Sequence, residues 1–102
     1  MLIMKKKIAF VINPISGTGS KKEFPEIIGE SLDNDLYEHE IVFTEHRLHG
    51  RDLAKHYVDS GFYAVIAVGG DGTVNEVARS LRHTDTALGI VPAGSGNGLA
   101  RH

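Results

Sequence analysis

Apolar and polar positions along this chain form blocks that predict strands separated by helices. Four short, nearly continuous apolar runs are typical of strands buried in a parallel sheet, at residues 7–13, 40–44, 65–68 and 87–91. Between these runs, apolar residues recur at helical spacing over residues 20–32, 51–60 and 73–82. The alternating order predicts an α/β domain: a doubly wound parallel sheet with helices on both faces.

Glycine-rich segments follow three of the four predicted strands, at residues 15–20, 69–73 and 92–97. Thr44 ends the remaining strand. Ligands of open parallel sheets bind outside the carboxyl ends of the strands, so these segments should share one edge. Glycine can adopt positive φ and lets the backbone approach a ligand closely. The pattern therefore predicts a phosphate-binding edge, with ordinary glycine-rich turns as the alternative.

The segment Gly69-Gly70-Asp71-Gly72-Thr73 has the most specific pattern. Thr73 is a predicted helix N-cap, and Glu76 three residues later would complete a capping box. Backbone N–H groups and the helix dipole at such a start favour a phosphate. The segment matches neither the dinucleotide fingerprint nor a Walker A loop. A carboxylate at Asp71 among these amides predicts a nearby cation or donor, the alternative being an Asx turn within the loop.

Composition narrows the classes of function. The chain of 102 residues is long enough for one small domain, and its net charge of −2 gives no indication of nucleic-acid binding. The absence of cysteine excludes disulfides and thiolate metal sites and is consistent with a reducing cytoplasm. The six histidines, His46 and His49 included, are interpreted as solvated side chains. Lys5-Lys6-Lys7 are interpreted as the solvated start of a strand, with a membrane-surface role as the alternative.

The longer segment GGDGTVNEV, residues 69–77, resembles the diacylglycerol kinase catalytic family, which includes sphingosine and ceramide kinases. Four further segments match that family in the same order: residues 13–17, Thr44, residues 50–54 and residues 92–97. NAD kinases and phosphofructokinases share the GGDGT motif, but the TVNEV extension and the last glycine segment argue against an NAD-kinase-like enzyme. The resemblance implies the N-terminal domain of a phosphofructokinase/NAD-kinase-like fold.

By this resemblance, the protein uses ATP and Mg²⁺ and transfers the γ-phosphoryl group to a lipid hydroxyl. Asp71 is the expected catalytic carboxylate, which organises Mg²⁺ or polarises the acceptor near the γ-phosphate. The residues expected to bind the nucleotide are Asn13, Pro14, Ile15, Ser16, Gly17, Thr44, Gly69, Gly70, Asp71, Gly72, Thr73, Val74, Asn75, Glu76 and Ser95. Without the resemblance, Asn13 would be a turn residue, Thr44 an ordinary strand residue and Glu76 a capping partner.

Residues 1–102 are expected to be the nucleotide-binding domain of a longer cytoplasmic kinase that is peripheral to the membrane. The β-rich second domain of the family, which supplies the catalytic base and most of the lipid pocket, is absent from this chain. We expect the chain alone to bind nucleotide weakly, not to turn over lipid, and to self-associate if an apolar patch is exposed. Gly98, where many bacterial diacylglycerol kinases have Asp, leaves open whether the lipid is diacylglycerol or a sphingoid base. The alternatives are an NAD-kinase-like phosphotransferase and a non-catalytic nucleotide-binding module.

Overall fold

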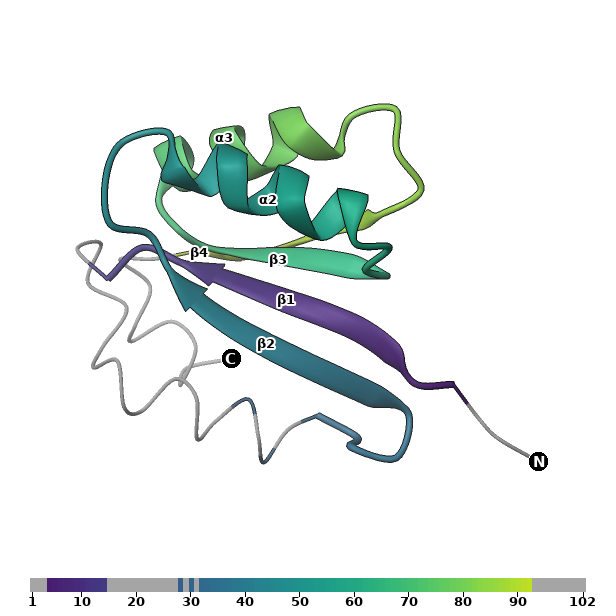
Figure 1. Cartoon of the computed structure of the whole chain (residues 1–102). Helices are drawn as coiled ribbons and strands as arrows, with labels where there is room; N and C mark the ends of the chain where they lie inside the picture. The colour runs from purple at the N-terminus through teal and green to yellow at the C-terminus, as the bar shows by residue number, and fades with distance from the viewer. Residues whose placement is uncertain (1–3, 15–27, 29, 31, 93–102) are drawn as a thin grey trace.

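A computed structural model describes residues 4–14, 28, 30 and 32–92, and these form a four-stranded sheet with two helices (Figure 1). The strands are β1 (Lys6–Ile12), β2 (Tyr37–Phe43), β3 (Ala64–Gly69) and β4 (Ala87–Pro92), and the helices are α2 (His49–Asp59) and α3 (Asp71–Leu81). The strand order is β2-β1-β3-β4, and every neighbouring pair is parallel. The α/β class and the parallel sheet predicted from the sequence are confirmed.

The two faces of the central strand β1 bury separate layers of the core. Side chains alternate along a strand, so Ala9 and Val11 face the layer that contains α2 and α3. Ile8 and Ile12 face the opposite layer, where they pack with Ile28, a residue in helical conformation. Because both faces are buried, both sets of positions are apolar, and the strand reads as a continuous apolar run.

The ends of the elements differ from the predicted ones by one to three residues. β2 begins at Tyr37 rather than at residue 40, because its first residues pair with Lys6 to Ala9 of β1 in parallel register. Glu38 and Glu40 are exposed along this strand, so its first half has no apolar run by which to recognise it. The predicted helix over residues 20–32 lies mostly outside the described residues.

Gly61 ends α2 in a Schellman motif, which agrees with the C-terminal glycine predicted from the sequence. Its φ of 79° is left-handed, its N–H donates to Val58 O at 3.0 Å, and the Phe62 N–H donates to Tyr57 O at 3.0 Å. The rings of Tyr57 and Phe62 pack with their centroids 4.7 Å apart. Burial, together with a hydrogen bond to Glu40 and the charge of that carboxylate, raises the pKa of Tyr57 well above its usual value.

The strand order reverses between β1 and β3, and this reversal locates the expected binding edge. The chain passes from β1 to β2 on one side and then from β3 to β4 on the other. Right-handed crossovers place the β1–β2 connection on the face opposite α2 and α3, where Ile28 packs. Ligands of such sheets bind outside the carboxyl ends of the strands at this switch point. Neither α2 nor α3, the helices with described bounds, is long and apolar enough to cross a membrane.

Candidate functional site

Three segments that are distant in sequence meet at the carboxyl edge of the sheet. The Asn13 N–H, just after β1, donates to Val68 O of β3 at 2.9 Å, and Asn13 Nδ2 donates to Thr73 Oγ1 at 3.3 Å. On the other side of β1, the Thr44 N–H donates to Ile12 O at 2.8 Å. The expected proximity of Asn13, Thr44 and the GGDGT loop is therefore confirmed.

The predicted site divides into a described and an undescribed part. Four of the predicted binding residues lie outside the described residues: Ile15, Ser16, Gly17 and Ser95. The glycine-rich segments at residues 15–20 and 93–97 lie outside them as well. Pro14 directly follows Asn13 and is half-buried at the same edge. The geometry of the site therefore comes from Asn13, Pro14, Thr44 and residues 69–76.

The three glycines of the GGDGT loop have two different structural roles. A Cβ on Gly69 would lie 2.8 Å from both Cβ and Oγ1 of Thr73, whereas a Cβ on Gly70 or Gly72 would have no neighbour within 4 Å. None of the three has a positive φ, so the left-handed conformation suggested by the sequence is not used. Gly69 admits the packed Thr73 side chain, and Gly70 and Gly72 leave open space on the outside of the loop.

Helix α3 begins two residues earlier than predicted, and the predicted Thr73–Glu76 capping box is wrong. Gly70 is the N-cap, no side chain caps this helix start, and the first helical bond runs from the Val74 N–H to Gly70 O at 3.1 Å. Thr73 lies in the first turn, only 6% exposed, with its hydroxyl directed to Asn13. The tertiary contact with Asn13 replaces the local cap.

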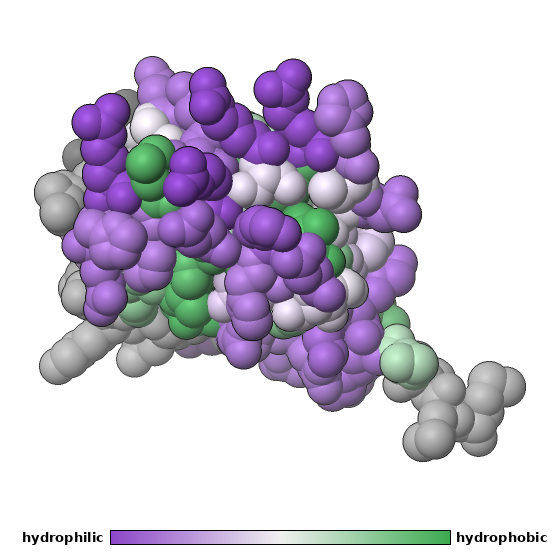
Figure 2. All heavy atoms as spheres, turned by 45° about the horizontal axis from the view of Figure 1, so that its top comes forward, coloured by the Kyte–Doolittle hydropathy of each residue, from purple (hydrophilic) through white to green (hydrophobic). Residues whose placement is uncertain are grey.

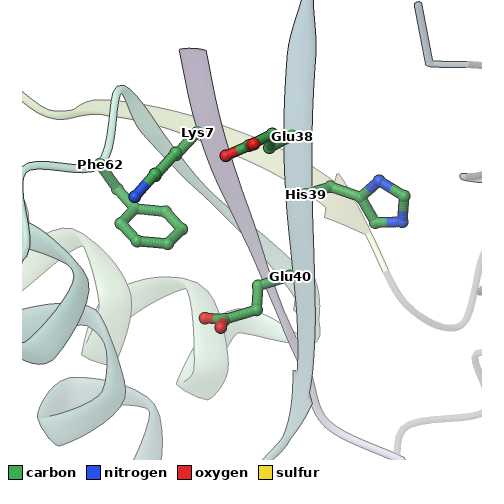
Figure 3. Close-up of a pocket in the computed structure, with 5 residues that line it drawn as sticks. All are labelled: Lys7, Glu38, His39, Glu40 and Phe62. Atoms are coloured by element: carbon green, nitrogen blue, oxygen red, sulfur yellow. The ribbon is translucent and has the colours of Figure 1, made fainter. Parts of the chain in front are cut away.

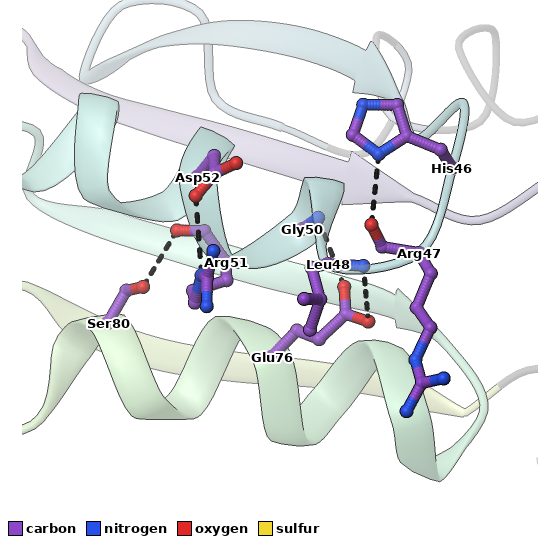
Figure 4. Close-up of polar contacts among 8 residues, drawn as sticks. All are labelled: His46, Arg47, Leu48, Gly50, Arg51, Asp52, Glu76 and Ser80. Atoms are coloured by element: carbon purple, nitrogen blue, oxygen red, sulfur yellow. Dashed lines mark hydrogen bonds and ion pairs between the residues drawn. The ribbon is translucent and has the colours of Figure 1, made fainter.

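Glu76 caps the neighbouring helix instead of its own. Its Oε2 accepts the Leu48 N–H at 3.0 Å and its Oε1 accepts the Gly50 N–H at 3.1 Å (Figure 4). Leu48 is the N-cap of α2, has a left-handed φ of 69° and makes no side-chain cap of its own. Glu76 thus satisfies two N–H groups at the start of α2, and its charge complements the helix dipole. Sequence reasoning missed this contact because it joins residues 26 and 28 positions apart.

Replacing Glu76 with glutamine should lower the free energy of unfolding by about 1–2 kcal/mol, because one accepting oxygen becomes an NH₂ group that cannot accept an N–H. Urea denaturation of the 102-residue chain measures this loss. Asn75→Ala, at the exposed neighbouring position, is the matched control and should change stability by less than about 0.5 kcal/mol. Equal stability of Glu76→Gln and the unsubstituted chain would contradict the capping role.

Asp71 is the exposed first residue of α3, at the carboxyl edge. Its carboxylate makes no hydrogen bond or ion pair with any residue that the structure describes. The alternative prediction, an Asx turn in which this carboxylate accepts a backbone N–H of its own loop, is therefore not seen among the described residues. Among the described residues, none therefore competes with a ligand for this carboxylate. The described residues contain no cluster of three or more His, Cys, Asp or Glu side chains that could hold a metal by itself.

A hollow of about 340 Å³ begins beside this edge and runs between the start of α2 and the length of α3. It is lined by Arg47, Leu48, Arg51, Gly72, Asn75, Glu76 and Arg79. The lining has three arginines and one carboxylate, Glu76, which already accepts two backbone N–H groups. Arg51 pairs with Asp52 at 3.3 Å, so Arg47 and Arg79 provide the positive charge of the hollow, which favours anionic groups. The outer face of α2 and α3 around it is mostly hydrophilic (Figure 2). Sequence reasoning missed this cluster because its arginines come from two segments distant in sequence, the start of α2 and the last turn of α3.

Comparisons with known proteins indicate the family of the chain. A family model described as the diacylglycerol kinase catalytic domain matches residues 7–102. Sphingosine kinase 1 of Caenorhabditis elegans is 39% identical over 98 residues, covering 86% of this chain and 21% of that protein. A diacylglycerol kinase of Mycobacterium tuberculosis is 36% identical over 96 residues, covering 93% of this chain and 31% of that protein.

A solved structure is similar in fold. The crystal structure of a diacylglycerol kinase from Bacillus anthracis matches 94% of this chain and 36% of its own, with a TM-score of 0.67 and 23% identity. The chain thus spans between 21% and 36% of the length of these three proteins. Because the family model covers nearly every residue, the chain belongs to the diacylglycerol kinase catalytic domain family, a family of lipid kinases.

Proposed function

We propose that this chain is the nucleotide-binding part of an ATP-dependent lipid kinase, which transfers the γ-phosphoryl group to a hydroxyl of diacylglycerol or a sphingoid base. The single observation that carries the proposal is the meeting of Asn13, Thr44 and the GGDGT loop at the carboxyl edge, where α3 also begins. Membership of a lipid kinase family supports the reaction class.

The triphosphate would lie over the first turn of α3. The N–H groups of this turn have no side-chain cap, and the open space beside Gly70 and Gly72 lets phosphate oxygens approach the backbone. The hydrogen bond from Asn13 to Thr73 ties the end of β1 to this turn. The end of β1 and the first turn of α3, which together form the proposed phosphate site, would therefore be positioned before the nucleotide binds.

The nucleoside would occupy the neighbouring hollow. Its lining includes Gly72, Asn75 and Glu76 from α3 and Leu48 from the loop after Thr44, so one ligand could contact both segments. Because both Glu76 oxygens already accept backbone N–H groups, Glu76 would act by shaping the wall of this hollow. Arg47, which extends toward α3 in Figure 4, would face the anionic part of the ligand.

Asp71 is the described residue best suited to hold Mg²⁺. Mg²⁺ is usually bound by one or two carboxylates together with phosphate oxygens, and Asp71 offers one exposed carboxylate beside the proposed phosphate site. Bound Mg²⁺ would offset the negative charge of the transferred group. The chain's own contribution to phosphoryl transfer would be positioning and charge stabilisation, which account for most catalysis in such enzymes.

The lipid would be held largely by a second domain outside this chain, at the membrane surface. We therefore expect the 102-residue chain to bind nucleotide and not to phosphorylate lipid. The acceptor is tested with the full-length protein, labelled ATP and a panel of diacylglycerol, sphingosine and NAD. Transfer to either lipid supports the proposal, and transfer to NAD alone would overturn it in favour of an NAD-kinase-like enzyme.

Gly72→Ala should separate nucleotide binding from folding. No atom lies within 4 Å of the added Cβ, and alanine is the better helix former, so the free energy of unfolding should stay equal or rise by up to about 1 kcal/mol. The methyl group would nevertheless enter the space proposed for phosphate oxygens. Calorimetric titration of the chain with Mg-ATP should show at least about tenfold weaker binding, a difference of about 1.4 kcal/mol.

Asp59→Ala is the control for this titration, because Asp59 is exposed at the opposite end of α2 and pairs with Lys55, and neither residue lines the hollow. It should leave Mg-ATP affinity within about twofold of the unsubstituted chain. Undiminished affinity of Gly72→Ala would place the phosphates elsewhere.

A further inference from the structure

A second hollow lies at the amino edge of the sheet, opposite the candidate site. We call it the amino-edge groove; it is formed by residues 4–7, 58, 60–63 and 85–86 and has a volume of about 760 Å³. Residues 4–7 lead into β1 and form its first two positions, residues 58 and 60–63 join the end of α2 to β3, and residues 85–86 precede β4. Strands of six or seven residues separate this groove from the carboxyl edge, which corresponds to about 20 Å.

Backbone hydrogen bonds fix the floor of the amino-edge groove. The Tyr63 N–H donates to Lys7 O at 2.8 Å, and the Ala87 N–H donates to Tyr63 O at 3.0 Å. The Thr86 hydroxyl donates to Phe62 O at 3.0 Å. The starts of three strands are thus tied together, so a ligand would meet a pre-formed surface and would lose less free energy to ordering it.

The amino-edge groove is positively charged. Lys5, Lys6 and Lys7 are all exposed, and Asp85 is the one acidic residue in its lining, which leaves two positive charges in excess. Lys6 Nζ lies 4.4 Å from the centroid of the Tyr63 ring, a cation–π distance. Within the described part of the chain, neither Lys5 nor Lys6 forms an ion pair.

Lys7 differs from the other two lysines. Its Nζ lies 5.9 Å from the centroid of the Phe62 ring, and these two residues line a separate pocket with Glu38 and Glu40 (Figure 3). Figure 3 shows both glutamates extending from the side of β2 that faces Lys7, while His39 extends from the other side. The charge of Lys7 is therefore partly offset, and Lys5 and Lys6 provide the uncompensated charge.

Apolar surface lies beside these lysines. Met4 is 91% exposed and Tyr63 is 47% exposed, and both line the amino-edge groove. A ligand that matches the groove would thus combine carboxylates with an apolar side chain. An acidic peptide has this combination, and a concave groove can receive an extended chain.

We propose that the amino-edge groove docks an acidic peptide segment of a partner protein. Carboxylates of the peptide pair with Lys5 and Lys6, and an apolar side chain packs on Met4 and Tyr63. A membrane surface fits less well, because it is flat, and contact here would hold the opposite edge about 20 Å from the lipid. The peptide site does not depend on the proposed function, since it uses no residue of the candidate site.

The test is a fluorescence anisotropy titration of the 102-residue chain against a labelled twelve-residue peptide of Glu, Asp and Leu. We expect binding that weakens as salt is raised. The double variant Lys5→Gln/Lys6→Gln should bind about tenfold more weakly, as expected for the loss of two exposed charge pairs. Lys55→Gln/Arg82→Gln removes the same charge from residues outside the groove and should bind like the unsubstituted chain.

Two results would overturn the proposal. If both double variants bind the peptide equally weakly, peptide binding responds to the net charge of the chain and there is no docking site. Sedimentation of the chain with phosphatidylglycerol vesicles through Lys5 and Lys6, without peptide binding, would assign the groove to a membrane. Mg-ATP titration of Lys5→Gln/Lys6→Gln should match that of the unsubstituted chain, which keeps this outcome separate from that of the nucleotide site.

Discussion

Asp71→Asn is expected to lower the rate of lipid phosphorylation by the full-length protein at least about a hundredfold, without unfolding the domain. The carboxylate is exposed at the first position of α3 and makes no hydrogen bond or ion pair with the described residues, so the isosteric amide should fit the same place. Only the negative charge is lost, and under the proposed function that charge holds Mg²⁺ beside the phosphates. The measurement is transfer of labelled phosphate from ATP to lipid at saturating Mg²⁺.

The loss of a carboxylate from a helix start also has a structural cost, and Asp52→Asn controls for it. Asp52 is exposed in the first turn of α2, so each substitution removes a favourable interaction with a helix dipole, about 0.3–1 kcal/mol. Asp52→Asn also removes an ion pair with Arg51 at 3.3 Å, which contributes little because both side chains are exposed. We expect similar unfolding free energies for the two variants but full activity for Asp52→Asn.

The dependence on Mg²⁺ distinguishes a metal role for Asp71 from a general electrostatic one. If Asp71 holds Mg²⁺, residual activity of Asp71→Asn should require a higher Mg²⁺ concentration than that of the unsubstituted protein. Activity of Asp71→Asn within a few-fold of the unsubstituted protein would remove this residue from the mechanism. A large loss of stability together with activity would instead show that the carboxylate supports the loop.

The parallel sheet and the gathering of the candidate site residues at its carboxyl edge were predictable, because both follow from local patterns in the sequence. β1 is buried on both faces, so its apolar run is continuous, and this run predicted a buried parallel strand. Parallel strands place their carboxyl ends on one edge, so the common position of Asn13, Thr44 and the GGDGT loop followed from their places at the ends of predicted parallel strands. The same reasoning could not locate the start of β2, because exposed Glu38 and Glu40 hide an edge strand in polar sequence.

The side-chain pairs of the site were not predictable, because they join residues distant in sequence. The spacing of Thr73 and Glu76 has the pattern of a capping box, yet each residue bonds elsewhere: Thr73 to Asn13, and Glu76 to the backbone of Leu48 and Gly50. These tertiary contacts outcompete the local cap. Gly50 shows the same dependence, since a Cβ there would lie 2.9 Å from Glu76 Oε1, a constraint that its sequence neighbours do not reveal.

Gly69→Ala should cause the largest loss of stability among the substitutions considered, about 3 kcal/mol, which is typical of strong overpacking. The added Cβ would lie 2.8 Å from Thr73 Cβ and Oγ1 and 3.2 Å from Thr73 Cγ2. Thr73 Cβ is fixed to the backbone of the first turn of α3, and its hydroxyl is held by Asn13, so no rotamer change removes the contact. Either β3 or the start of α3 must move.

Gly70→Ala is the matched control for this clash, because it adds the same methyl group one residue further along the loop. Gly70 is extended (φ −83°, ψ −170°) and a Cβ there has no neighbour within 4 Å, so its unfolding free energy should change by less than about 0.5 kcal/mol. Urea denaturation of both variants measures the difference. Similar stabilities would show that Gly69 is not needed for the packing of Thr73. A large difference would show that the first glycine of the motif serves the fold. Any effect of Gly69→Ala on the proposed phosphate site would then be indirect, because it would follow from the movement of Thr73 away from Asn13.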